Sequence, residues 1–263
     1  MRYLTKRNRA ILREMISTDF KVRYQGSALG YLWSLLRPIF MFAVLYVVFV
    51  YIFKLNKGIP HYPVYLFMGI VLWNFFQETT MIGMSSVVAR GDLIRKISIP
   101  RYLVVMSSSA SALINLSLNL LVVLAVALLN GLSVQLSWLW LIPLLLELFI
   151  FASTVAFFLA AVFVKFRDVA YIWEVFMQAA FYGTPILYSM ALVPLQYQKW
   201  MLINPMAQII QDARYVVVTN STVTAWTTQR LRYALLPLVI IALFAVISTI
   251  YFKKQSKYFA ENI

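Results

Sequence analysis

Six apolar stretches, each about as long as a membrane-spanning helix, divide the chain. A helix needs roughly 20 mostly apolar residues to cross the hydrocarbon core of a bilayer. Charged residues, Gly, Asn or Pro bound these stretches, which cover residues 38–54, 63–86, 102–129, 138–164, 169–188 and 233–252. The pattern predicts an all-α integral membrane protein with six transmembrane helices.

The residues before the first span separate apolar and basic positions onto two faces of a helix. At about 100° per residue, one face carries Leu4, Ile11, Leu12, Met15 and Val22. The opposite face carries Lys6, Arg9, Arg13 and Lys21. This arrangement is typical of a helix that lies in the membrane interface, with its basic side chains reaching toward lipid headgroups. We assign residues 1–37 to a cytoplasmic amphipathic interface helix; a plain lipid anchor, or a device that only fixes the topology, fits the wheel equally well.

The distribution of Lys and Arg among the loops sets the orientation of the spans. With the N-terminus inside, seventeen of the 23 Lys and Arg residues fall on the inner side and six fall outside. Because cytoplasmic loops carry the excess of basic residues, we expect both termini to be cytoplasmic. The six spans then occupy residues 38–252, and residues 253–263 form a cytoplasmic tail.

The composition excludes several classes of protein. Of the 263 residues, 62% are hydrophobic and 12% are charged, against about 25% charged in soluble domains. The net charge of +14 therefore faces anionic headgroups, a phosphate-bearing substrate or both, rather than nucleic acid. With no cysteine and a single histidine, His61, in a loop between spans, a disulfide, a thiol nucleophile and a His-rich metal or proton-relay site are excluded.

Polar residues inside the spans mark faces that avoid lipid. Three carboxylates fall within spans, at Glu78, Glu147 and Glu174. Each costs about 2.5–3.5 kcal/mol on insertion scales unless it faces a bundle interior, a cavity or a partner subunit. Glu174 aligns with Gln178 and Phe181 on a helix that the Gly183-Thr184-Pro185 segment breaks, and such breaks are tolerated only where protein or water covers the backbone. Hydrogen bonding between helices is the better interpretation of a polar stripe on the third span, formed by Ser108, Ser111, Asn115 and Asn119.

Aromatic residues form a second stripe, on the first span. Phe42, Tyr46, Phe49 and Phe53 follow the spacing i, i+4, i+7, i+11, which places them on one face of a helix. Packing within the bundle is the commoner reason for such a stripe. The alternative is a lining on which sugar rings stack.

The chain lacks the parts that would let it power transport alone. It has no Gly-rich phosphate-binding loop for ATP, no pair of matching interrupted helices in two halves, and no His/Asp/Glu cluster for acid–base or metal chemistry. Energy must therefore come from a partner. The loop of residues 89–101 is short, charged and partly apolar, so a short helix there could bind a groove of a cytoplasmic partner; an ordinary basic inside loop is the alternative.

Five segments in this order resemble one family. They are Asp19–Pro38, the Leu93–Pro100 loop, Phe166-Arg167-Asp168, Gly183-Thr184-Pro185-Ile186 and Asn204-Pro205. Together they resemble the membrane subunits of ABC-2 type exporters of cell-surface polysaccharides, over essentially the whole chain. The amino-acid sequences of the first segment and of residues 204–214 look closest to those of rhamnose-polysaccharide exporters of streptococcal type.

The resemblance implies a homodimer that pairs with two copies of a cytoplasmic ABC ATPase. ATP and Mg would bind that partner, so this chain would hold no cofactor, no metal and no catalytic residue. The interface helix maps onto about residues 5–30, a coupling helix onto about 90–98, and short extracellular helices that return into the outer leaflet onto about 189–228. The residues implied in ATPase coupling are Arg90, Asp92, Leu93, Ile94, Arg95 and Lys96.

In the family, the first and fifth spans face each other across the dimer and line a channel. The implied channel residues here are Phe42, Tyr46, Phe49, Phe53, Tyr171, Glu174, Gln178, Phe181 and Tyr182. A basic cytoplasmic entry for the lipid-linked phosphate would comprise Arg9, Arg13, Lys21, Arg23 and Arg37. Arg37 departs from the family, in which many members have a neutral residue before the Pro, so it acts either as a headgroup anchor or as a contact to pyrophosphate.

The expected function is ATP-driven export of an undecaprenyl-(pyro)phosphate-linked polysaccharide, of rhamnan, teichoic acid or O-antigen type, across the bacterial plasma membrane. This chain would be a permease and not an enzyme. One alternative is an ABC-2 exporter of a small drug or a lipid. A second is an ion-coupled carrier that uses Glu78 and Glu174. An integral-membrane glycosyltransferase or phosphatase ranks lowest, because the chain lacks an acid–base or metal cluster.

Overall fold

A computed structural model describes residues 5–24, 32–52, 54, 59–96, 99–228 and 234–259. Across these ranges the regular structure is helical and contains no strand, which confirms the all-α prediction. The long helices of the bundle are α2 (Leu32–Tyr46) with its π-helical continuation η1 (Val47–Ile52), α3 (Tyr62–Ala89), α5 (Tyr102–Leu129), α6 (Leu141–Lys165), α7 (Val169–Gly183) and α12 (Leu236–Gln255). The remaining helices are α1 (Lys6–Tyr24), α4 (Gly91–Lys96), η2 (Leu136–Trp140), η3 (Met190–Leu192), α8 (Leu195–Met201), α9 (Pro205–Val217), α10 (Ala225–Thr228) and η4 (Ser256–Tyr258).

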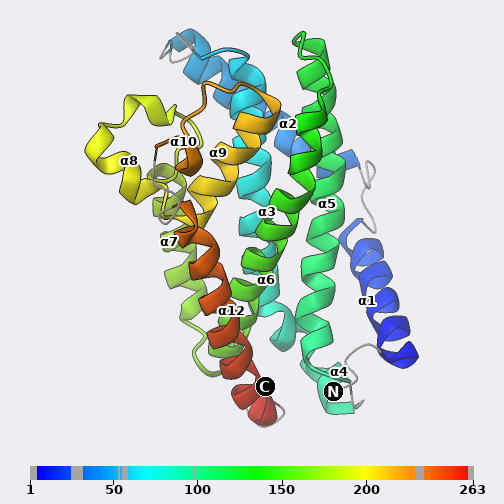
Figure 1. The fold of residues 1–263 in the computed structure, drawn as a ribbon. Helices are drawn as coiled ribbons and strands as arrows, with labels where there is room; N and C mark the ends of the chain where they lie inside the picture. The colour runs from blue at the N-terminus through cyan, green and yellow to red at the C-terminus, as the bar shows by residue number, and fades with distance from the viewer. Residues whose placement is uncertain are drawn as a thin grey trace.

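The helix α3 forms the centre of the bundle (Figure 1). It packs against α5 and α6 over most of its length, and against α2, α7 and α9 at its flanks. Every residue from Val64 to Trp73 is buried, as expected of a helix that is apolar on all sides. The helices α2, α5, α6 and α7 therefore take their positions from contacts with α3, whereas α12 packs against α6 and α9.

The close approach of α3 to α6 depends on a glycine. A Cβ atom added at Gly83 would lie 2.6 Å from the Cβ of Ala156, which is well inside van der Waals contact. Small residues at such crossings let helix backbones approach closely in membranes. This pair fixes the spacing of the two helices near the C-terminal end of α3, where Gly83 lies.

The variant Gly83→Ala is expected to lower the melting temperature of the purified protein. Overpacking costs about 1–3 kcal/mol, which exceeds the gain of up to about 1 kcal/mol that alanine brings to a helix. The matched control is Gly183→Ala, since a Cβ at Gly183 meets no atom within 4 Å. Thermal unfolding in detergent measures both, and an equal melting temperature for the two variants would contradict the close approach.

Within the described residues, three helices are long and apolar enough to cross a membrane by length and composition: Tyr102–Leu129, Leu136–Lys165 and Leu236–Tyr258. They coincide with the third, fourth and sixth predicted spans. The first predicted span corresponds to a shorter apolar helix, Pro38–Ile52. The fifth ends earlier than predicted, at Gly183 rather than residue 188, because the backbone turns extended at Thr184 (φ −100°, ψ 138°). The count of six spans stays a prediction.

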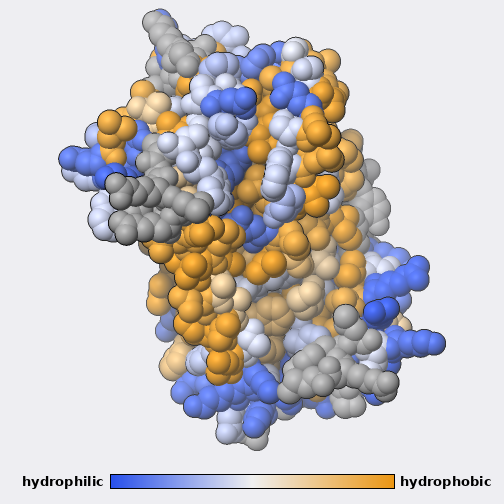
Figure 2. All heavy atoms as spheres, in the orientation of Figure 1, coloured by the Kyte–Doolittle hydropathy of each residue, from blue (hydrophilic) through white to orange (hydrophobic). Residues whose placement is uncertain are grey.

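The segments predicted to lie inside the cell gather at one end of the molecule. In Figure 1, the start of α1, the helix α4 and the end of α12 all lie at that end. The helices η1, α8 and α9 lie toward the opposite end. Figure 2 shows an apolar band between two ends that carry hydrophilic residues. This arrangement is the one that a chain with both termini on the same side of a membrane requires.

Candidate functional site

One face of α7 presents polar and aromatic side chains to the exterior of the single chain. Tyr171, Glu174, Gln178 and Tyr182 recur every three or four residues, and all four are exposed. Tyr171 and Tyr182 are 73% and 70% exposed. A carboxylate and an amide on a span are costly against lipid, so this face belongs to a cavity or a partner subunit. We call these four residues the α7 stripe.

The opposite face of α7 lines an apolar groove. Ile172, Trp173 and Phe176 of α7 form one wall, and Ile240 and Phe244 of α12 form the other. The cavity between them measures about 450 Å³. These positions lie about half a helical turn away from the α7 stripe, so α7 separates a polar, aromatic surface from a hydrocarbon-like one.

Two contacts fix the rotation of α7 about its axis. The indole Nε1 of Trp173 donates to the hydroxyl of Thr80 on α3 at 3.1 Å, and Thr80 is fully buried. Phe181 is half-buried and packs edge-on against Trp73 of α3, with ring centroids 5.8 Å apart. Phe181 therefore anchors α7 to the core, while the α7 stripe remains exposed.

The break after α7 is held in place by a buried arginine of α9. The guanidinium of Arg214 donates from Nη1 to the carbonyl of Pro185 at 2.6 Å and from Nη2 to the carbonyl of Ile186 at 2.6 Å. Both carbonyls would otherwise lack a helical partner, because the chain leaves the helix at Thr184. Arg214 thus replaces the backbone hydrogen bonds that the broken helix gives up.

The same guanidinium binds α3. Its Nε donates to the carbonyl of Tyr65 at 2.9 Å, and its centre lies 3.6 Å from the centroid of the Tyr65 ring, a cation–π contact. Arg214 is 0% exposed, and a Cβ at Gly69 would collide with its Nη2. We call this set, in which one arginine joins α3, α9 and the break after α7, the Arg214 clamp.

The aromatic stripe of α2 packs against the core within the single chain. The ring of Phe42 stacks on Phe67 of α3 with centroids 4.7 Å apart, and Phe42 and Tyr46 are 5.6 Å apart. Phe49 is also half-buried against the core, whereas Phe53 lies outside the described residues. These contacts favour the packing interpretation for Phe42. A channel role for Tyr46 and Phe49 stays a prediction.

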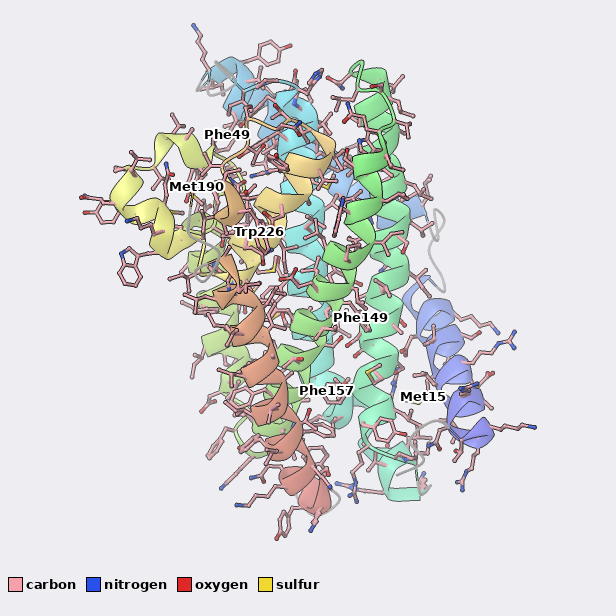
Figure 3. The ribbon with its side chains drawn as sticks, viewed as in Figure 1. Met15, Phe49, Phe149, Phe157, Met190 and Trp226 are labelled. Atoms are coloured by element: carbon pink, nitrogen blue, oxygen red, sulfur yellow. The ribbon has the colours of Figure 1, made fainter. Side chains whose placement is uncertain are left out.

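At the opposite end of the bundle, α1 packs along α5 as an amphipathic helix. Met15 is buried with Val104 and Ile94, and Ile11 and Leu12 pack around them; Figure 3 shows Met15 between α1 and α5. This confirms the apolar face predicted for these three residues of α1. Arg9, Arg13 and Lys21 are exposed, and the side chains of Arg23 and Arg37 lie outside the described residues.

The junction of α3 and α4 carries an internal ion pair. Arg90 forms a salt bridge with Asp19 of α1 and donates from Nη1 to the hydroxyl of Ser107 on α5 at 2.7 Å. The sequence-based assignment gives Arg90 a contact with the ATPase, but its guanidinium joins α1 to α5. Ile94 is also buried, in the cluster around Met15.

The remaining candidates on α4 have accessible side chains. Asp92, Arg95 and Lys96 are exposed, and Leu93 is half-buried. The described helix covers Gly91–Lys96, within the predicted range of about 90–98, and residues 97–98 lie outside the described residues. A contact between these residues and an ATPase stays a prediction.

The polar stripe on α5 bonds mostly to its own helix. The hydroxyls of Ser108 and Ser111 donate to the carbonyls of Val105 and Ser107, so hydrogen bonding between helices was the wrong interpretation for these two serines. Asn115 does cross between helices, and its Nδ2 donates to Oε1 of Glu78 on α3 at 2.8 Å. This amide satisfies one of the three carboxylates predicted inside the spans.

A buried carboxylate of α9, outside the predicted spans, titrates in an unusual range. Asp212 is 6% exposed, and its Oδ2 accepts from Nε2 of Gln208 at 2.6 Å. Burial raises the pKa of Asp212 from 3.8 to about 6, while the hydrogen bond from Gln208 acts in the opposite direction. Proton binding by Asp212 therefore favours the folded state, and that contribution is lost as the pH rises from about 4 through about 6.

We expect Asp212→Asn to stabilise the protein above pH 7 and to change little below about pH 4. The two-unit pKa shift corresponds to about 2.7 kcal/mol at most, or a rise in melting temperature of roughly 5 °C at pH 8. Melting curves from about pH 3.5 to about pH 8 measure the difference. Asp92→Asn, at an exposed position, is the control, and a parallel pH profile for the variant and the unmodified protein would rule out a buried titrating Asp212.

Comparison with known proteins assigns the family. A family model described as ABC-2 type transporter matches residues 12–218, which is more than three quarters of the chain. The chain belongs to the ABC-2 type transporter family. The ABC-2 chain is 32% identical over 199 residues to the O-antigen export system permease protein RfbA of Klebsiella pneumoniae, covering 74% of this chain and 75% of the relative. It is 26% identical over 263 residues to a protein of the same name from Myxococcus xanthus, covering 97% of this chain and 96% of the relative.

Two features of this ABC-2 chain escape prediction from the sequence. Arg214 sits in the quoted segment 204–214 but reads there as one of six basic residues on the outer side, whereas it is fully buried. Asp19 begins the first quoted segment. Its partner Arg90 lies 71 residues later in the sequence, so no local pattern indicates the pair. The available signal for Arg214 was a basic residue on a helix made mostly of apolar residues; for the pairing of Asp19 there was no signal in the sequence.

Proposed function

We propose that this ABC-2 chain is the membrane subunit of an exporter that moves a lipid-linked cell-surface polysaccharide out of the bacterial cytoplasm. Relatives that carry the name O-antigen export system permease support this class of substrate. The proposed cargo is an undecaprenyl-(pyro)phosphate-linked chain of O-antigen, teichoic acid or rhamnan type. The resemblance to streptococcal rhamnose-polysaccharide exporters stays a prediction.

The two faces of α7 carry this proposal. The α7 stripe offers tyrosine rings, a carboxylate and an amide, the groups that contact sugar rings and hydroxyls. The groove on the opposite face, between α7 and α12, is lined by aliphatic and aromatic side chains that suit a hydrocarbon chain. A glycan joined to a polyprenyl lipid needs both surfaces at once, and one helix provides them back to back.

The proposed assembly is a homodimer of six-span subunits with both termini in the cytoplasm and two ABC ATPase subunits beneath it. The exposed basic side chains of α1 attract the phosphate of the lipid, because anionic groups gather at such surfaces. Closure of the ATPases on ATP pushes α4 and α1, and the α7 stripes of the two subunits part to admit the glycan. ATP hydrolysis takes place on the partner, and this chain breaks no covalent bond.

Deletion of the gene in its host tests the proposal. We expect loss of the surface polysaccharide together with accumulation of its lipid-linked precursor inside the cell, both measured by blotting of fractionated membranes. Complementation with a Glu174→Ala and Gln178→Ala double variant should restore export poorly. Complementation with Val246→Ala, at an exposed site on α12, should restore it fully.

Other results would favour the competing functions. Normal surface polysaccharide in the deletion strain, with a loss of lipid or drug efflux, would support an exporter of small amphiphiles, for which the apolar groove is the favourable observation. Transport by the purified chain in a proton gradient without any ATPase would support an ion-coupled carrier.

A further inference from the structure

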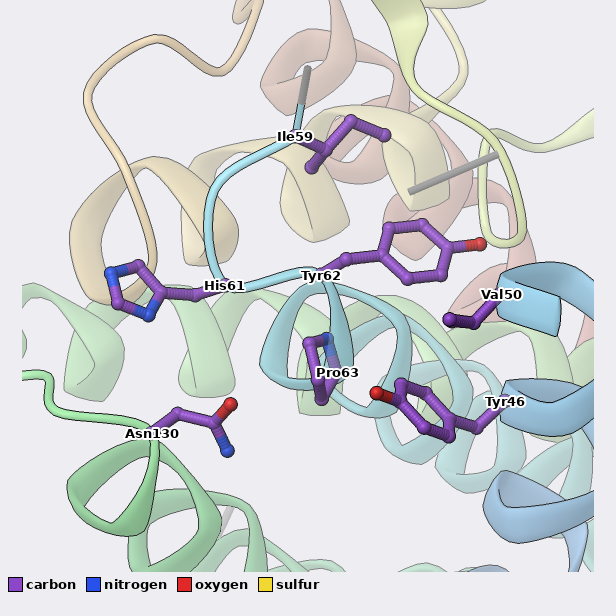
Figure 4. Close-up of a pocket in the computed structure, with 7 residues that line it drawn as sticks. All are labelled: Tyr46, Val50, Ile59, His61, Tyr62, Pro63 and Asn130. Carbon is purple, nitrogen blue, oxygen red and sulfur yellow. The ribbon is translucent and has the colours of Figure 1, made fainter. Parts of the chain in front are cut away.

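A second cavity lies at the outer end of the bundle, away from both faces of α7. It measures about 280 Å³ and lies where η1, the start of α3 and the end of α5 converge (Figure 4). Its lining includes two tyrosines, a histidine, an asparagine and a proline: Tyr46, His61, Tyr62, Pro63 and Asn130. Among the described residues that line it, there is no Asp, Glu, Lys or Arg.

The side chains in this cavity converge from separate elements. In Figure 4 the hydroxyl of Tyr46 and the amide of Asn130 point toward the ring of Pro63 from opposite sides. Asn130 comes from the end of α5, and His61 precedes α3. A concave site with apolar ring surfaces and a few convergent neutral polar groups is the usual form of a small-molecule pocket.

The backbone around the cavity departs from regular helix on two sides. The segment Val47–Ile52, next to Tyr46, is a π-helix, a form found mostly at functional sites. His61 adopts a left-handed conformation (φ 50°, ψ 41°), and its side chain makes no capping hydrogen bond to α3. A strained non-glycine residue whose side chain does not serve the fold often marks a ligand site.

The cavity is joined to the break after α7. The hydroxyl of Tyr62 donates to the carbonyl of Leu187 at 2.9 Å, one residue beyond the carbonyl of Ile186 that the Arg214 clamp holds. Tyr62 therefore connects the wall of the cavity to the same short segment that the clamp holds.

We propose that this cavity binds one or two uncharged sugar units of the glycan as it leaves on the outer side. The proposal rests on the proposed function and adds a subsite and a charge preference to it. Tyr46 and Pro63 offer flat apolar surfaces to the C–H faces of a sugar ring, and Asn130 and His61 offer donors and acceptors to its hydroxyls. Because none of the described residues that line the cavity carries a cationic side chain, these residues lack the paired donors that hold a phosphate or a uronate.

Binding of soluble oligosaccharides to the purified full chain in lipid nanodiscs tests the subsite. The probes are tetrasaccharides of rhamnose, mannose and galactose, with a galacturonate tetrasaccharide as the charged comparator, measured by saturation-transfer NMR. We expect at least one neutral tetrasaccharide to bind more tightly than the galacturonate. His61→Gly and Asn130→Ala should each weaken that binding about fivefold or more, by the loss of about 1 kcal/mol of hydrogen bonding.

The variant at position 61 separates binding from folding. Glycine adopts the left-handed conformation of His61 without strain, so His61→Gly should keep or raise the melting temperature while it weakens binding. Tyr197→Ala removes an exposed aromatic residue of α8 outside the cavity and should leave binding unchanged.

Three results would overturn the subsite: no binding of any neutral tetrasaccharide, stronger binding of the galacturonate, or equal binding by His61→Gly and the unmodified chain. The gene deletion tests the proposed function separately. Loss of surface polysaccharide on deletion combined with any of these three results refutes the subsite alone.

Discussion

Replacing Arg214 by alanine is expected to lower the melting temperature of the purified permease by about 10 °C and to abolish export. The backbone carbonyls of Tyr65, Pro185 and Ile186 all accept hydrogen bonds from the guanidinium. The variant leaves these three carbonyls inside the protein without that donor. Each buried acceptor left without a partner costs roughly 1–3 kcal/mol. Loss of the cation–π contact with Tyr65 adds to this sum.

Lysine at position 214 distinguishes geometry from charge. A single ammonium cannot reach two carbonyls with the fork of a guanidinium, so Arg214→Lys should recover only part of the lost stability. Lys199→Ala, at an exposed site on α8, is the control for removal of a cation near the outer end. Gly69→Ala, whose Cβ would collide with Arg214, should reproduce a milder form of the defect.

Thermal unfolding and export are measured on the same set of variants. A melting temperature of Arg214→Ala within about 2 °C of the unmodified protein, equivalent to less than about 1 kcal/mol, would show that the clamp does not hold the broken end of α7. Full export by this variant would show that transport does not depend on the clamp.

Reversing the charge of either partner in the Asp19–Arg90 pair is the second large effect that we expect. Asp19→Arg or Arg90→Asp should each lower export about tenfold, the factor that corresponds to roughly 1.4 kcal/mol. The pair joins α1 to the junction of α3 and α4, the two elements proposed to contact the ATPase. Under the proposed mechanism, loss of this pair separates the movement of α4 from that of α1.

The double variant, which combines Asp19→Arg with Arg90→Asp, restores the attraction between the two side chains and should recover much of the export. Such a cycle isolates the pairwise term from the effects of the single changes. Glu14→Gln removes an exposed carboxylate from the same helix and should leave export unchanged. Additive losses in the double variant would refute a functional link between these two residues.

The sequence predicts a structural feature well when the residues that determine the feature lie close together in the chain. The third span matches Tyr102–Leu129 because hydropathy and length alone define it. The buried face of α1, with Ile11, Leu12 and Met15, follows from spacing within one helix. Such features need only the periodicity of neighbouring residues.

The Arg214 clamp could not be predicted in this way. Its acceptors lie 149, 29 and 28 residues away in the sequence, at Tyr65, Pro185 and Ile186, and they are backbone groups that carry no signature in the residue type. The same applies to Phe42, whose contact with Phe67 decides between packing and lining. Periodicity places an aromatic side chain on a face but does not say which neighbour covers that face.

The end of α7 at Gly183 has a consequence for the membrane around it. Fifteen residues at 1.5 Å each make a helix about 22 Å long, against a hydrocarbon core of about 30 Å. Proteins answer such a mismatch by thinning the bilayer locally or by covering the gap. Beyond Gly183 the clamped segment and most of the helix α9 are buried in protein. In the proposed exporter, a polar headgroup that moves along α7 has about a quarter less hydrocarbon to cross than beside a full-length helix.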